Sequence, residues 1–120
     1  IVDGVVPFPG WEFFPAEDVD DLDEATRART APLTHSVPAR VPTDEIELGP
    51  GARHRVPVTL LMGGLDQETL ESELEQWGPY AEEFRAIDDA EVVRIGSGHW
   101  PQFSVPNRLA ALLDAAITRR

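Results

Sequence analysis

The clearest hydrophobic pattern lies in the second half of the chain. Residues 56–62, VPVTLLM, form a nearly continuous apolar run of strand length, which is typical of a parallel strand covered on both faces. The turn sequence GGLD follows at once, and residues 90–95, AEVVRI, predict the next short strand. These two runs therefore predict neighbouring strands of a parallel sheet.

Helical spacing appears between the two predicted strands and again after the second one. Leu70, Leu74 and Trp77 recur at i, i+4 and i+7, and the Gly-Pro pair at 78–79 should end that helix before a further helical turn. Near the end of the chain, apolar residues form one stripe of a last helix that has Pro106 in its first turn; they are Leu109, Leu112, Leu113, Ala116 and Ile117. We expect Ser104 to cap this helix.

The first half of the chain is less regular. Residues 1–6, IVDGVV, suggest the second half of a buried strand whose first half lies upstream, and the absence of an initiating methionine suggests a cut end. Residues 7–55 carry seven of the eleven prolines and an acidic run, so we expect a long connection there, with one short helix near residues 18–28.

The order of these elements predicts the fold class. Strand, long connection, strand, helix, strand and helix imply parallel pairing through crossovers. We therefore expect an α/β fold, a parallel sheet with flanking helices, in which 1–120 is part of one domain: strand 1–6, a cap-like or lid-like connection 7–55, and a strand-helix-strand-helix unit 56–120. A strand at 1–6 would leave one edge of this sheet unpaired, which calls for a neighbouring strand from elsewhere.

Charge and composition exclude several classes of partner. The 120 residues include 22 acidic and 10 basic side chains, and the net charge of -12 argues against nucleic acid and anionic membrane surfaces. No apolar run approaches the roughly 20 residues that span a bilayer. There are no cysteines, which excludes disulfides and thiolate metal sites and leaves the cytoplasm as the expected compartment.

The candidate chemistry lies after the two predicted strands. In open parallel sheets, catalytic groups gather beyond the carboxyl ends of the strands. Asp66 follows the strand at 56–62, and His99 follows the strand at 90–95, 33 residues later in sequence (99 − 66). A carboxylate that accepts a hydrogen bond from an imidazole leaves the other ring nitrogen to take a proton from a nucleophile. Alternatively, Asp66 caps the following helix and His99 is a turn residue.

Two segments carry a resemblance to a known family. VPVTLLMGGLD and VVRIGSGHWPQFSVPNRLAALL resemble the strand-seven segment, and the strand-eight segment with the last helix, of esterase-like α/β-hydrolase fold proteins. The resemblance implies that this chain is the C-terminal part of such a fold, from the sixth strand to the last helix. It also implies that Asp66 is the acid and His99 the base of a catalytic triad.

The nucleophile that this resemblance implies is missing. The family places it in a G-x-S-x-G turn, and these 120 residues contain no such motif. Ser97 precedes His99 by two positions, too close to present its hydroxyl to the same ring. We therefore expect an upstream part of the same hydrolase to supply the nucleophile, which is a serine in esterases and an aspartate in the haloalkane dehalogenases and epoxide hydrolases that share the fold.

Aromatic residues are the candidates for contacts with substrate. The segment PFPGWEFFP holds Trp11, Phe13 and Phe14, which either pack on a core or line an access path as part of a lid. Trp100 follows His99 and either borders the active site or lies in the core.

Metal and cofactor chemistry find little support in the sequence. His35 and His54 lie in polar loops without the spacing of metal ligands, and the acidic run from Glu17 to Glu24 lacks the glycine and spaced ligands of a calcium loop. We expect no cofactor and no metal. The predicted function is hydrolysis of a small ester-like substrate; the alternative is a noncatalytic small-molecule binding or receptor protein on the same fold.

Overall fold

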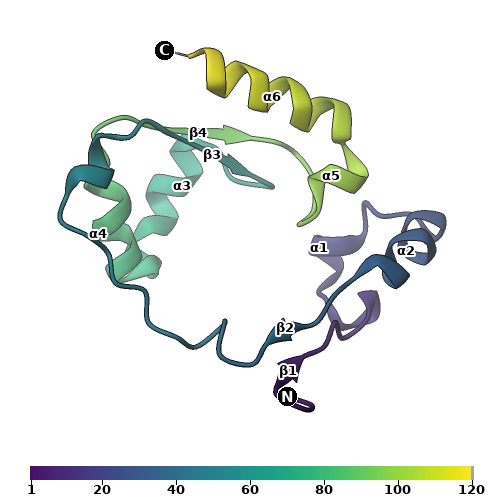
Figure 1. Cartoon of the computed structure of the whole chain (residues 1–120). Coiled ribbons are helices and arrows are strands. Elements are labelled where there is room, and N and C mark those ends of the chain that lie inside the picture. Colours follow the sequence, from purple (N-terminus) through teal and green to yellow (C-terminus); the bar gives the residue numbers. More distant parts are fainter. Residues whose placement is uncertain (120) are drawn as a thin grey trace. The chain divides into compact units, whose positions relative to one another are not determined.

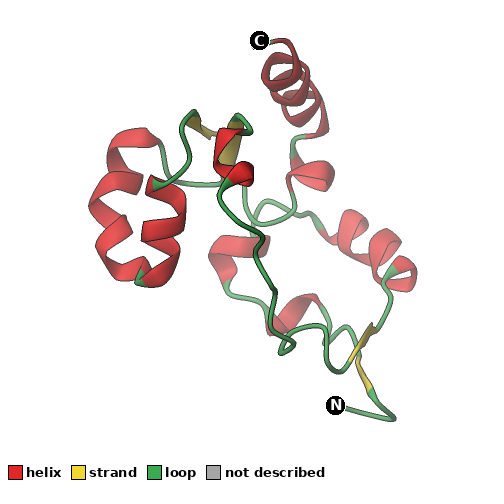
Figure 2. Cartoon of the chain, turned by 60° about the vertical axis from the view of Figure 1, so that its left-hand side comes forward, coloured by secondary structure: helices red, strands yellow, loops and turns green. Residues whose placement is uncertain are grey.

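The chain forms two compact units, which we describe separately: Ile1–Leu48, and a second unit that begins at Gly49. The computed structural model describes residues 1–119 (Figure 1). Helices account for most of the regular structure, and residues 39–51 form turns and bends with no helix or strand (Figure 2).

The N-terminal unit is built around a buried tryptophan. Its elements are β1 (Val5–Val6), η1 (Trp11–Phe13), α1 (Ala16–Val19), α2 (Glu24–Thr30), η2 (Ala31–Leu33) and β2 (Val37–Pro38). Trp11 is 7% exposed, Val19 and Leu22 of the same unit are also buried, and the Trp11 ring lies 5.0 Å from that of Phe8. The indole Nε1 of Trp11 donates to the carbonyl of Arg27, 3.1 Å away, so the ring buries its apolar surface without losing its hydrogen bond.

The predicted strand at 1–6 is wrong, because a tight turn interrupts it. Asp3 and Gly4 both have positive φ, 50° and 79°, and Val2 and Val5 exchange backbone hydrogen bonds of 2.9 and 3.0 Å. An Asp-Gly pair with two positive φ angles is the signature of a two-residue hairpin turn. The two residues that remain extended form β1, which pairs antiparallel with β2 in a sheet separate from that of β3 and β4, instead of forming the parallel edge strand.

The second unit confirms the predicted strand-helix-strand-helix order. Its elements are η3 (Ala52–Arg55), β3 (Val58–Met62), α3 (Gln67–Glu73), η4 (Leu74–Trp77), α4 (Pro79–Arg85), β4 (Ala90–Arg94), α5 (Pro101–Ser104) and α6 (Pro106–Thr118). Strands β3 and β4 pair parallel over five residues, from Val58 opposite Ala90 to Met62 opposite Arg94. Gly78, with φ of 54°, separates η4 from α4, and Pro79 opens α4, so the helical pattern breaks at 78–79 as the sequence predicts.

The two faces of the β3–β4 pair differ in how well they are covered. Leu60 and Val92 point to the face on which α3, η4 and α4 pack, and there Leu70 is fully buried and Leu74 is 3% exposed. The opposite face carries Thr59 of β3 and Glu91 and Val93 of β4. Helix α6 lies on that side of the strand pair (Figure 1). No residue of α6 is buried, so the predicted apolar stripe of this helix is only partly covered.

The expected cap of α6 is also wrong. Val105 precedes this helix at the capping position, and no side chain there bonds the first turn. Ser104 instead ends α5, and its hydroxyl is buried with no hydrogen-bond partner among residues 1–119. The Pro106 that opens α6 has no backbone N–H, which reduces the number of donors that a cap would have to satisfy.

Candidate functional site

The carboxyl ends of β3 and β4 lie in direct contact. Ile95 N donates to Met62 O over 2.8 Å, and Gly96 N donates to Gly63 O over 2.9 Å, so the pairing continues past both strands. A methyl group on Gly63 would lie only 2.7 Å from Ser97 O. Glycine is therefore required at position 63 for the backbone of the second turn to approach so closely.

Asp66 lies three residues beyond Gly63 and begins α3. Its Oδ1 accepts from Thr69 N over 3.0 Å and from the Thr69 hydroxyl over 2.7 Å, while Asp66 N donates to that hydroxyl over 2.9 Å. This reciprocal arrangement is a capping box, so the alternative interpretation of Asp66 as a helix cap is confirmed. Two hydrogen bonds from Thr69, first from its backbone and then from its side chain, lower the pKa of Asp66, because both favour the charged carboxylate.

His99 lies three residues beyond Gly96 in the equivalent turn after β4. The side chain is exposed, and its ring centroid is 4.7 Å from that of Trp100 at an interplanar angle of 65°. Trp100 is half-buried and immediately precedes α5. The structure thus brings His99 and Trp100 together on one turn.

No hydrogen bond joins Asp66 to His99 in the part of the chain that the structure describes. Both Thr69 contacts end on Oδ1 of Asp66, which leaves Oδ2 as the oxygen that would accept from an imidazole. The hydroxyl of Ser97 donates to the carbonyl of Gly98 over 2.9 Å, so its proton is directed at the backbone. The catalytic roles of Asp66 and His99 stay predictions.

The other aromatic candidates belong to the N-terminal unit. Phe14 lies 6.3 Å from Trp11 and 5.8 Å from Phe13, measured between ring centroids. Trp11 is part of the core of that unit, whereas Phe13 is 72% exposed. The aromatic segment was expected either to pack on a core or to line an access path. For Trp11 the first interpretation therefore holds.

Comparison with known proteins identifies no relative. No protein-family model, curated protein or solved structure matches this chain.

Residues 1–119 contain neither a candidate metal-binding group nor a helix that could span a membrane. Among these residues no three His, Cys, Asp or Glu side chains are grouped so that they could hold a metal ion. In the same range, each helix is too short or too polar to cross a bilayer.

One polar cluster was not foreseen from the sequence. Glu83 accepts two hydrogen bonds from Arg53, at 2.6 and 2.8 Å, and its Oε1 lies 3.0 Å from His54 Nε2. Arg53 is the main reason that the pKa of Glu83 falls to about 2, with a smaller contribution from His54. His54 thus joins η3 to α4 through its contact with Glu83. No local signal reveals this, because the partners lie about 30 positions apart.

Proposed function

We propose that this chain is part of a hydrolase for ester-like bonds, with His99 as general base and Asp66 as the acid that orients it. The observation that supports this most is the hydrogen-bonded contact between Gly63 and Gly96. Asp66 and His99 each follow one of these two glycines by three residues, on turns that meet beyond the carboxyl ends of β3 and β4. Open parallel sheets bind their ligands beyond the carboxyl ends of the strands.

The proposed reaction assigns one step to each side chain. The nucleophile, a serine in a part of the enzyme outside these 120 residues, attacks the ester carbonyl, and water then hydrolyses the acyl-enzyme after the alcohol has left. His99 takes the proton of the nucleophile as it attacks, and later gives it to the leaving alcohol. Oδ2 of Asp66 accepts from the other ring nitrogen and stabilises the imidazolium, while Oδ1 keeps its bonds to Thr69.

Substrate contacts are assigned to the aromatic residues of the chain. Trp100 packs beside the His99 ring and would provide an apolar border for the substrate. The proposed mechanism uses no cofactor. We propose a cytoplasmic enzyme that acts on a small molecule.

The second candidate is a noncatalytic binding protein on the same fold. The capping box favours it, because the bonds that Asp66 makes to Thr69 give this residue a structural role without catalysis. The two candidates differ in the residue at the centre of the nucleophile turn, which is serine or aspartate in an enzyme and glycine or alanine in a binding protein.

A serine-directed assay tests the enzyme. The chain is produced together with the polypeptide encoded immediately upstream, and p-nitrophenyl acetate hydrolysis and fluorophosphonate labelling are measured. We expect both reactions in the complex, and we expect His99→Ala to abolish them while the matched change His35→Ala at another exposed histidine does not. Equal hydrolysis by the His99→Ala and His35→Ala variants would refute the assignment.

A further inference from the structure

Helix α6 is attached to the β3–β4 pair by arginine side chains near its two ends. Near the start of the helix, Arg108 Nη2 donates to the carbonyl of Arg94 on β4 over 3.1 Å. Directly after the helix, the guanidinium of Arg119 bridges two carboxylates: Nη2 lies 3.2 Å from Asp89 Oδ1, and Nη1 lies 3.4 Å from Glu91 Oε2. The side chain of Arg119 is 29% exposed, and those of Asp89 and Glu91 are 58% and 43% exposed, so water and salt reach this bridge.

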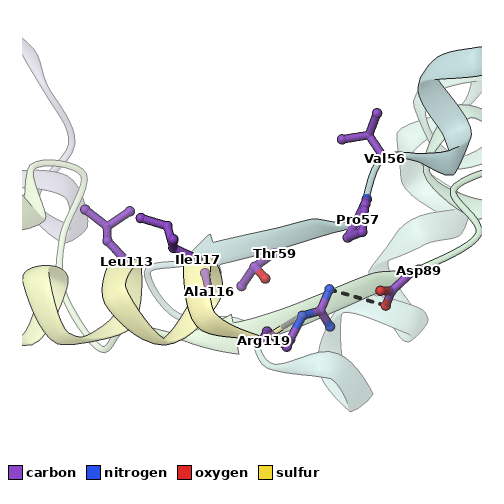
Figure 3. A pocket seen from close by; sticks show the side chains of 8 residues that line it. All are labelled: Val56, Pro57, Thr59, Asp89, Leu113, Ala116, Ile117 and Arg119. Atoms are coloured by element: carbon purple, nitrogen blue, oxygen red, sulfur yellow. Dashed lines mark ion pairs between the residues drawn. The ribbon is translucent and has the colours of Figure 1, made fainter.

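Little apolar surface is buried between these attachments. Two hollows, of about 320 and 380 Å³, are lined by residues of both α6 and the strand pair, and Figure 3 shows the first of them. Leu113 and Ile117 of the apolar stripe are 48% and 71% exposed, whereas Leu70 of α3 on the opposite face is fully buried. Because hydrophobic stabilisation scales with the apolar area removed from water, it holds α6 less firmly than α3.

The helix is also built to open separately from its neighbours. It has 13 residues, and an isolated helix of about this length is marginal in water, so α6 depends on its attachments to stay helical. Val105, with φ of -134° and ψ of 51°, separates α6 from α5 and has the backbone angles of neither helix. The pairing of β3 with β4 uses no backbone group of α6. Loss of the helical hydrogen bonds of α6 therefore leaves the strand pair intact.

We propose that α6 is a salt-sensitive strap, which opens as one local unit while β3, β4, α3, η4 and α4 stay folded. The bridge from Arg119 to Asp89 and Glu91 holds the strap closed. Elements with few buried apolar contacts are those that open locally, and salt screens charges that are partly exposed. Opening uncovers the sheet face that carries Thr59 and Val93. This inference is independent of the proposed hydrolase activity.

Amide hydrogen exchange of the full 120-residue chain tests the strap. We expect the amides of α6 to exchange faster than the Leu74 amide, which donates to Leu70 O in the core. Raising sodium chloride from about 0.02 M to about 0.5 M should accelerate exchange in α6 severalfold and leave the Leu74 amide unchanged. The double variant Asp89→Asn, Glu91→Gln should accelerate exchange in α6 about three- to tenfold at low salt and remove most of the salt response. This variant leaves the sequence of α6 unaltered, so helix propensity does not account for the effect.

The neighbouring Asp88 provides the matched control. It is exposed on the same turn as Asp89, and its side chain is not part of the bridge. Asp88→Asn removes one negative charge and should leave exchange in α6 unchanged. Equal effects of Asp88→Asn and the double variant would overturn the strap. So would exchange in α6 at the rate of the Leu74 amide, the absence of a salt response in the unmodified chain, or acceleration of α6 and Leu74 alike in the double variant.

Discussion

The contact between Gly63 and Ser97 gives a direct test of how the two strand ends are held together. In Gly63→Ala the new methyl group would lie 2.7 Å from Ser97 O, whereas ordinary contacts of a Cβ atom begin at 3.4 Å. The neighbouring atom belongs to the backbone, so one turn must move by several tenths of an ångström. Overpacking of this kind costs about 1–3 kcal/mol of unfolding free energy. The displaced turn also carries His99.

The adjacent glycine provides a matched control. A methyl group on Gly64 meets no atom within 4 Å, and neither glycine has a positive φ. Gly64→Ala should therefore be neutral, or stabilising by about 0.4–1 kcal/mol through the lower entropy of the unfolded chain. Urea unfolding and thermal unfolding of both variants measure the difference, with the melting temperature changing by roughly 4–8 °C per kcal/mol for a domain of this size. If the two variants unfold alike, the close approach of the two turns is not real.

Three further predictions concern the cap of α3, the stability of the chain at acid pH, and the core of the second unit. Asp66→Asn keeps a capping side chain, so it should retain stability yet lower turnover of the proposed enzyme by about 10⁴-fold, whereas Asp66→Ala should lose both; full activity of Asp66→Asn would leave only the capping role. Because Arg53 lowers the pKa of Glu83 from 4.5 to about 2, the stability from Glu83 is complete above pH 4.5 and is lost as the pH falls toward 2. Glu83→Gln should flatten acid unfolding curves in that range, and an unchanged curve would contradict the role of this cluster. Leu70→Ala should cost about 2–5 kcal/mol in urea unfolding, since Leu70 is fully buried; a loss below 1 kcal/mol would argue against the core described above.

Local chemistry explains which elements the sequence predicts well. Within the uncharged run at 56–62, Val58–Met62 form β3, and Leu70 and Leu74 lie in the core at the helical spacing that predicted them. Pro79 and Pro106 open helices, because proline lacks the N–H that a helix interior needs. Even the error at residues 1–6 had a local signal, since Asp3-Gly4 is a strong hairpin sequence that the apolar residues around it obscured.

The sequence by itself therefore determined the two strands of the second unit and the helices that follow them, because each depends on residues a few positions apart. Tertiary structure alone decided which edges and side chains meet. The pairing of β1 with β2 spans about 30 residues, as does the contact of Arg53 with Glu83, and neither leaves a periodic trace. Among residues 1–119, β3 pairs with β4 alone, and its bare outer edge is likewise a property of the assembled sheet, because an edge exists only once the neighbours of a strand are known.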